Sequence, residues 1–114
     1  MNDNREVVQG TLDLLVLSTL RPGAMHGWGI SRRIRERSGE VVLVTTGSLY
    51  PALHRLESRR LIRAEWRTSD NNRRARFYRV TASGRRQLQA ETRNWQETMA
   101  LIGRFFTVKP EDVQ

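Results

Sequence analysis

Apolar residues repeat with the period of an α-helix over the first part of the chain. From residue 8 to residue 20 they share one helical face, and the Arg21-Pro22-Gly23 sequence that follows is typical of a helix end. Ile30 and Ile34 form the inward pair of a second helix, which we expect over residues 27–38. Residues 24–29 should form the turn that leads from one helix into the other.

Residues 45–60 predict a third helix, around which the rest of the chain is organised. Thr46 or Ser48 is expected to cap it, because a side-chain oxygen there can accept hydrogen bonds from the N–H groups of the first turn. We expect Pro51 in that first turn, where the missing N–H of a proline had no partner to lose. Three leucines spaced i, i+4 and i+7 form the apolar face of this helix: Leu49, Leu53 and Leu56.

After residue 60 the hydrophobic period changes from 3.6 to 2. Residues 62–67 alternate between apolar and charged side chains, residues 68–73 are rich in turn formers, and residues 74–80 alternate again. This pattern predicts a β-hairpin. Three helices followed by a hairpin make a winged helix-turn-helix, so we predict a mostly α fold with a small β-hairpin. Its DNA-binding domain should cover residues 1–81.

A long final helix is predicted over residues 82–106, with Thr81 or Ser83 as its cap. Its apolar residues alternate in spacings of four and three, which is the pattern of a dimerisation seam. The winged domain does not need a helix of this length for its own core, and the commonest partner for such a seam is a second copy. Residues 107–114 should form a flexible tail. The seam consists of Leu88, Thr92, Trp95, Met99, Ile102 and Phe106, and all of these except the polar Thr92 are the predicted dimerisation residues.

The distribution of charge indicates a nucleic-acid partner. The chain has 20 basic and 12 acidic residues, a net charge of +8, and every basic residue except Lys109 is an arginine. Residues 1–90 hold 17 arginines and 8 acidic residues, whereas residues 91–114 hold 3 basic and 4 acidic residues. The planar guanidinium of arginine suits phosphate and guanine recognition. A basic body with a near-neutral end therefore indicates that the winged domain binds nucleic acid.

Other functional classes find little support in the sequence. The 114 residues suffice for one small domain, and the absence of cysteine excludes disulfides and thiolate metal sites. His26 and His54 are the only histidines and fall in no recognisable catalytic motif, so we expect neither an enzyme nor a cofactor. No apolar run approaches the roughly 20 residues of a membrane span. The first six residues also lack the order of a signal peptide, so we expect a cytoplasmic protein without a membrane partner.

The predicted third helix turns polar groups outward, where they can contact phosphates and base edges. We expect Tyr50 to donate a hydrogen bond to a phosphate; in the alternative, its ring packs against the first helix. His54 is equally consistent with a base contact and with a plain surface position. Glu57 is most simply the ion-pair partner of a nearby arginine. The candidate DNA-binding residues of this helix are Thr46, Ser48, Tyr50, Pro51, His54 and Arg55.

The tip of the predicted hairpin is the second candidate DNA contact. Asn72, Arg73 and Arg74, with Arg76 beside them, should lie against the phosphate backbone or reach into a minor groove. Positioning on phosphates is the default expectation, because phosphate contacts outnumber base contacts in protein–DNA complexes. The hairpin is thus predicted to add affinity for DNA of any sequence.

The chain resembles the PadR-type transcriptional regulators, in particular their short form with a single C-terminal dimerisation helix. The resemblance runs from about residue 9 to residue 106, and its most specific part is residues 47–57. Trp28 stands where the family more often has tyrosine. The segments that carry the resemblance are residues 9–17 (QGTLDLLVL), 26–30 (HGWGI), 47–57 (GSLYPALHRLE) and 78–84 (YRVTASG).

The resemblance implies a homodimeric winged-helix repressor that binds an inverted-repeat operator in double-stranded DNA. It also implies regulation by small compounds, often aromatic or cationic, that enter near the dimer interface. Trp95 stands where short members of the family place a tryptophan that lines this pocket, although it is equally consistent with a residue of the dimer core. Met99 would suit an adaptable wall of such a pocket.

Two alternatives to an operator-binding regulator remain open at this point. One is a dimeric protein-interaction module that has the winged-helix shape but no operator. The other is an architectural module that binds DNA without sequence preference and without an effector. An enzyme is a third and weaker alternative, because the chain lacks a plausible catalytic set.

Overall fold

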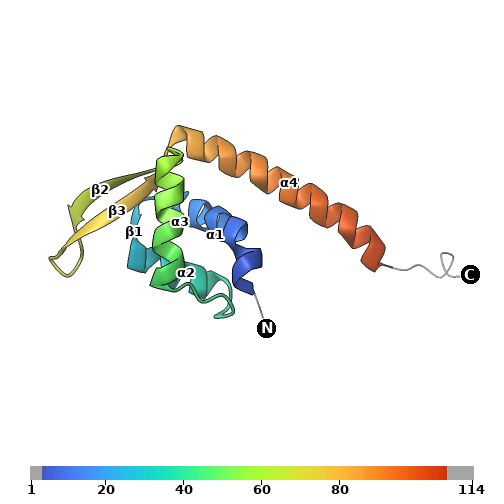
Figure 1. Cartoon of the computed structure of the whole chain (residues 1–114), viewed down its shortest axis with the longest axis horizontal. Helices are drawn as coiled ribbons and strands as arrows, with labels where there is room; N and C mark the ends of the chain where they lie inside the picture. The colour runs from blue at the N-terminus through green and yellow to red at the C-terminus, as the bar shows by residue number, and fades with distance from the viewer. Residues whose placement is uncertain (1–3, 108–114) are drawn as a thin grey trace, which may run out of the picture.

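The computed structural model describes residues 4–107, with side chains from residue 10 onward (Figure 1). The first helix begins at Asn4, before the point at which its apolar pattern starts, and the final helix has the predicted bounds. Of the expected tail, residues 108–114 lie outside the described part of the chain. The elements in chain order are α1 (Asn4–Leu20), β1 (Met25–His26), α2 (Gly27–Arg37), α3 (Thr46–Ser58), β2 (Ile62–Thr68), β3 (Arg74–Val80) and α4 (Ala82–Phe106).

The predicted hairpin forms and is joined by a third, very short strand. β2 and β3 pair antiparallel, with Trp66 opposite Arg76. β1 pairs with the other edge of β3, with Met25 opposite Tyr78, so the strand order is β1-β3-β2. The expectation that residues 24–29 form only a turn is therefore wrong. A strand of two residues is too short to show a hydrophobic period, which is why the sequence does not reveal it.

The core lies between the three helices and the sheet of the winged domain, and α3 contributes several of its most deeply buried residues. Leu49, Leu53 and Leu56 are at most 2% exposed, as their spacing predicts. Burying an aliphatic side chain of this size stabilises a fold by roughly 1.5–3 kcal/mol, so the three leucines hold α3 firmly against its neighbours. The other elements contribute the buried side chains Leu12, Val16, Leu17, Leu20, Ile30, Ile34, Ile62, Tyr78 and Val80.

Leu61 joins α3, the hairpin and α4 at one point. Its amide donates to the carbonyl of Leu56 at 2.9 Å, and its own carbonyl accepts from the amide of Thr81 at 3.0 Å. Thr81 also caps α4, because its hydroxyl oxygen accepts from the amide of Gly84 at 3.0 Å. A Cβ added to Gly84 would lie 2.0 Å from the Leu61 carbonyl oxygen, so only glycine allows this close approach.

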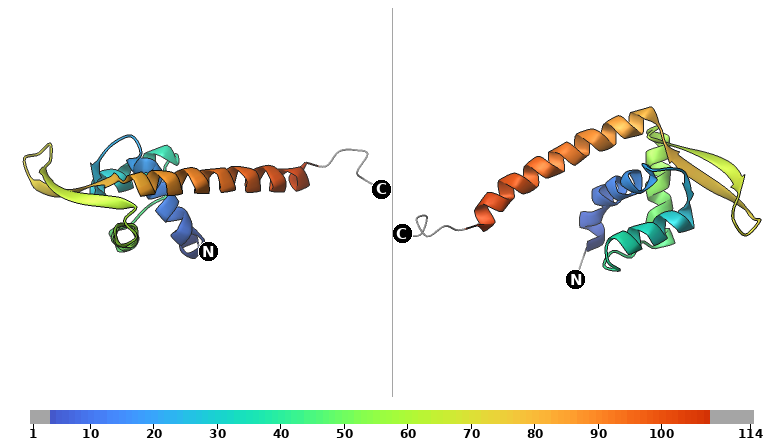
Figure 2. Two further views of the ribbon diagram at one scale, coloured as in Figure 1. Left: turned by 90° about the horizontal axis from the view of Figure 1, so that it is seen from above. Right: turned by 180° about the vertical axis from the view of Figure 1, so that it is seen from behind.

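α4 leaves the winged domain from this junction, in the direction opposite to the hairpin (Figures 1 and 2). Leu88 is its last buried residue, and the predicted seam beyond it is open to solvent. Trp95 is 48% exposed, Ile102 43% and Phe106 81%. Within residues 4–107, no helix is both long enough and apolar enough to cross a membrane.

Candidate nucleic-acid interface

Thr45 caps α3, whereas Thr46 or Ser48 was expected in this role. The hydroxyl oxygen of Thr45 accepts from the amide of Ser48 at 3.3 Å, and its backbone is extended, with φ −82° and ψ 161°. All three residues have a suitable hydroxyl, and the backbone conformation alone decides which of them precedes the helix. Thr46 is therefore the first residue of α3 and lies exposed at its start.

Pro51 is the sixth residue of α3 and stands in its second turn, so its expected place in the first turn is wrong. At this position an ordinary residue would donate its amide to the carbonyl of Gly47, and proline has no amide hydrogen to donate. Pro51 and Gly47 are both exposed. The carbonyl of Gly47 thus lacks its usual partner within the helix, on the side that faces solvent.

One row of α3 residues faces solvent along the length of the helix. At about 100° per residue, Gly47, Pro51, His54 and Ser58 share the side opposite the leucines, and all four are exposed. We call these four residues the outward row. Ser58 was not among the predicted DNA-binding residues, although its place four residues after His54 is a sequence signal that identifies it.

Tyr50 lies beside the outward row and packs against the start of α2. Its hydroxyl is 2.8 Å from the position that a Cβ on Gly27 would occupy, so the missing side chain of Gly27 makes room for the ring. This contact is with α2, whereas the alternative considered from the sequence placed the ring against the first helix. With 49% of the residue exposed, Tyr50 remains at the surface next to the outward row.

Arg55 forms an ion pair with Asp13 of α1. Its Nη2 donates to Oδ1 at 2.7 Å and its Nε donates to Oδ2 at 3.3 Å, a bidentate arrangement that joins two helices far apart in sequence. The hydrogen bond to Asp13 raises the pKa of Arg55 above its ordinary value. In the structure the guanidinium of Arg55 lies on the flank of α3 that faces α1, and the DNA contact expected of Arg55 stays a prediction.

Glu57 pairs with Arg76, which confirms that it is the ion-pair partner of a nearby arginine. Nη2 of Arg76 lies 2.9 Å from a carboxylate oxygen of Glu57, and the same guanidinium lies 6.0 Å from the centre of the Tyr78 ring. The pair links β3 to the C-terminal half of α3. Arg76, predicted as a DNA contact, therefore also forms a link between the hairpin and α3.

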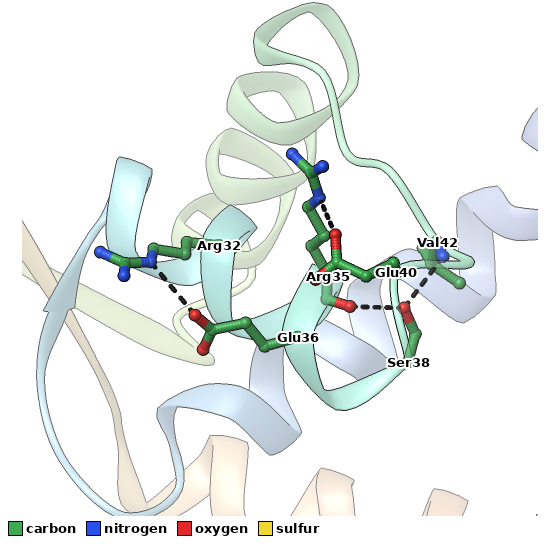
Figure 3. A network of polar contacts seen from close by, with 6 residues as sticks. All are labelled: Arg32, Arg35, Glu36, Ser38, Glu40 and Val42. Carbon is green, nitrogen blue, oxygen red and sulfur yellow. Dashed lines mark hydrogen bonds and ion pairs between the residues drawn. The ribbon is translucent and has the colours of Figure 1, made fainter.

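The end of α2 and the loop after it are held by a polar network (Figure 3). Ser38 donates its hydroxyl hydrogen to the carbonyl of Arg35 at 3.0 Å and accepts from the amide of Val42 at 2.9 Å. Because this loop leads directly into Thr45, the network helps to fix where α3 begins. Two ion pairs complete it: Arg32–Glu36 and Arg35–Glu40.

The hairpin tip presents Arg73 and Arg74 at the surface. The turn depends on Asn72, which adopts a left-handed conformation with φ 64° and donates its amide to the carbonyl of Ser69. The guanidinium of Arg74 stacks 5.3 Å from the centre of the Trp66 ring, a cation–π contact that orients it. Among the residues that the structure describes, neither arginine has an acidic partner.

An open groove of about 790 Å³ brings the hairpin tip and α3 together. It runs between the hairpin, Tyr50 and the start of α2, where the His26 Nδ1 accepts from the amide of Gly29 at 3.0 Å and so caps α2. His26 was not among the residues predicted for the interface. The lining of the groove includes three arginines predicted for DNA binding and three aromatic residues that were not: Arg73, Arg74, Arg76, His26, Trp28 and Trp66.

An outward row of exposed residues on a helix lies beside a hairpin whose tip arginines have no acidic partner within the described residues, and this arrangement defines a winged helix-turn-helix DNA-binding protein. The model of the family described as "Transcriptional regulator PadR-like family" matches residues 16–90. The chain therefore belongs to the PadR-like family of transcriptional regulators, which are DNA-binding regulators and not enzymes.

Relatives and solved structures agree with this assignment. The transcriptional regulator Rv3488 of Mycobacterium tuberculosis is 34% identical over 93 residues, which cover 82% of this chain and 83% of the relative. The structure of a transcriptional regulator from Clostridium thermocellum, Cth-833, matches with a TM-score of 0.79 at 28% identity. The match covers 90% of this chain and 99% of the Cth-833 chain. The structure of a PadR family transcription regulator from Clostridium difficile R20291 matches with a TM-score of 0.77 at 27% identity. This match covers 86% of this chain and 100% of the other chain. The predicted fold is thus confirmed.

Replacing Asp13 with alanine should weaken DNA binding, although the removal of a carboxylate that repels phosphate would by itself strengthen it. Without the ion pair, α3 loses a link to α1 and Arg55 loses its fixed position. Asp13→Ala and Arg55→Ala should each lower the free energy of unfolding, with a coupling energy of about 1 kcal/mol in the double variant, as for a partly exposed pair. Denaturant titrations measure stability, and fluorescence anisotropy with a duplex measures affinity.

The two single variants should lose DNA affinity by similar factors. If Arg55 instead contacts DNA directly, Asp13→Ala would keep or gain affinity while Arg55→Ala alone would lose it. Glu97→Ala is the matched control, because it removes one negative charge from an exposed position of α4 and should leave both measurements unchanged.

Proposed function

We propose that the protein is a homodimeric repressor that binds an inverted-repeat operator in the cytoplasm and responds to a small ligand. The observation that carries the proposal is the exposed seam of α4. Trp95, Met99, Ile102 and Phe106 are each at least 43% exposed, and they repeat at heptad spacing. A contiguous apolar stripe of this kind is stable in water when it is covered, and a second copy of the same helix covers it by symmetry.

A two-fold axis through this seam would present two copies of α3 to one face of a duplex. Two recognition helices enter successive major grooves when they lie about 34 Å apart, and the half-sites then mirror the symmetry of the protein. This relation supports an inverted repeat as the operator. Bound across a promoter, such a dimer would exclude other proteins from the same DNA and so act as a repressor.

Within each copy, α3 and the hairpin would have different tasks on the DNA. The outward row would face the base edges, with the side chains of His54 and Ser58 and the carbonyl of Gly47, which has no amide donor at Pro51, as hydrogen-bonding groups. Arg73 and Arg74 would bind phosphates, which positions the protein on the duplex without reading its sequence. A module without sequence preference would need only the second of these tasks.

Replacing Arg73 and Arg74 together with alanine should weaken binding to every duplex. Each lost phosphate contact should lower the slope of log affinity against log salt by about 0.9, so the pair should lower it by nearly 2. Anisotropy titrations at several salt concentrations, with the protein's own upstream DNA and with an unrelated duplex, measure both quantities.

Arg33→Ala combined with Arg37→Ala is the control, since it removes the same charge from exposed positions that do not line the groove. A loss confined to the upstream DNA would show that the hairpin reads bases. Equal affinity of the unmodified protein for both duplexes would instead favour the module without sequence preference.

The charge substitution Ile102→Glu should separate the dimer into monomers. It places a carboxylate in the seam, where a partner helix would bury it, so operator affinity should fall by about 100-fold or more through the loss of bivalent binding. Leu101→Glu is a matched control, because Leu101 is 54% exposed on the opposite side of α4. Sedimentation velocity reports the oligomeric state. Dissociation by Leu101→Glu alone, or a monomeric unmodified chain, would contradict the proposed seam.

Trp95 and Met99 support the ligand response, because they stand one helical turn apart on the seam and are both exposed in the single chain. In a dimer each would meet its symmetry mate near the axis. A flat aromatic molecule can enter between such rings, since stacking replaces the contacts it breaks and methionine adapts its shape.

Proflavine, a planar aromatic cation, should therefore quench the tryptophan fluorescence of the unmodified protein. The saturable part of the quenching should vanish in Trp95→Phe and persist in Trp28→Phe, which removes an exposed tryptophan of the winged domain. Equal quenching in the two variants would leave Trp95 as a plain residue of the dimer core.

A further inference from the structure

The reverse face of the hairpin carries a group of arginines that do not line the groove between the hairpin tip and α3. Because side chains alternate along a strand, Arg63 and Arg67 of β2 share this face with Arg79 of β3, opposite to the face that carries Trp66. Arg85, in the first turn of α4, faces the same space. These four arginines, which we call the reverse-face cluster, border a pocket of about 400 Å³ that Thr81 also lines.

Two members of the cluster are placed where they repel each other. Arg63 lies directly opposite Arg79 in the antiparallel pair, and like charges in such positions destabilise a sheet. Within residues 10–107, neither guanidinium takes part in an ion pair. Glu65 is the acid on this face, and Arg67 already binds it at 2.9 Å. The repulsion between Arg63 and Arg79 is therefore not relieved by an ion pair within the described chain.

The arginines of this face also act together on Glu65. The hydrogen bond from Arg67 lowers the pKa of Glu65 below its ordinary value, and the charges of Arg79 and Arg63 lower it further. Although Glu65 offsets one of the positive charges, three more surround the pocket. An anion from outside the chain is the species that such a surface stabilises most.

Other contacts hold the pocket in shape before any ligand arrives. Arg67 is fixed both by Glu65 and by the Phe77 ring, whose centre lies 5.4 Å from its guanidinium carbon. Arg85 donates to the carbonyl of Arg21 at 3.5 Å. The pocket also reaches Thr81 and Ala82 at the start of α4, where the N–H groups of the first turn and the positive end of the helix dipole add to the field.

We propose that the pocket of the reverse-face cluster binds a small anion that carries two or more negative charges on phosphate or carboxylate groups. Guanidinium groups bind such oxygens in pairs, and four of them match a multivalent anion better than a monovalent one. The volume suits a small metabolite. The pocket and the groove between the hairpin tip and α3 have no lining residue in common, which argues against a duplex bound in that groove as the occupant of the pocket.

The test uses the whole protein and three probes: inorganic phosphate, pyrophosphate and citrate, each compared with chloride at the same ionic strength. At least one probe should bind with one site per chain in isothermal titration calorimetry and raise the melting temperature. Which probe binds tightest identifies phosphate or carboxylate groups as the natural ligand chemistry. Arg63→Gln and Arg79→Gln should each weaken that binding about tenfold.

The melting temperature of the protein without a bound anion is an independent measurement, and there the loss of Arg79 should be stabilising. Without any multivalent anion, Arg79→Gln should raise the melting temperature by about 2–4 °C, because it removes the repulsion from Arg63. Arg33→Gln, the control with the same charge change on an exposed face of α2, should change neither the melting temperature nor the binding.

Three results would overturn the proposal. The probes could fail to stabilise the protein beyond chloride. Arg33→Gln could weaken anion binding as much as Arg79→Gln does, which would reduce the effect to net charge. Alternatively, the Arg63 and Arg79 variants could lose duplex affinity as strongly as the Arg73 and Arg74 variant, which would make the reverse face a part of the DNA contact.

Discussion

The backbone contact between Leu61 and the first turn of α4 sets the geometry of every functional element in this protein. α3 ends in a hydrogen bond to the Leu61 amide, and the hairpin closes on the Leu61 carbonyl through Thr81. α4 starts where Gly84 lies against that same carbonyl. Because these contacts involve main-chain atoms, the identity of most surrounding side chains does not alter them. Gly84 is the exception, since any Cβ would force α4 away from the strand.

Arginine has two physical roles in this chain, and the net charge of +8 does not distinguish them. Where an acid lies within reach, the guanidinium holds elements together, as Arg55 does with Asp13 and Arg76 with Glu57. Where none does, it remains available to phosphate, as at the hairpin tip. The structure distinguishes the two roles, whereas the sequence does not, because the partners of Arg55 and Arg76 belong to other elements, 42 and 19 residues away in sequence.

The difference between local and long-range contacts also explains how much could be predicted from the sequence. The helices and the two long strands follow from periodic burial, which is a local property, so their order, their approximate positions and the leucine face of α3 were predicted correctly. The strand at Met25–His26 and the contact between Tyr50 and Gly27 depend on which segments meet in space. The sequence pattern holds no signal for either. The predictions of the α3 cap and of the place of Pro51 were wrong for a different reason. Thr45, Thr46 and Ser48 all have a hydroxyl that can cap a helix, so the sequence does not decide at which of them α3 begins.

The fixed base of α4 gives its length a mechanical consequence. Its 25 residues span about 37 Å, and those after Leu88 are open to solvent. The helix is thus an arm anchored at one end only. A rotation of about 5° at Gly84 would move the far end by roughly 3 Å over that length. In the reverse direction, a shift of that size at Phe106 would turn α3 and the hairpin together by the same small angle, because both are tied to the same carbonyl.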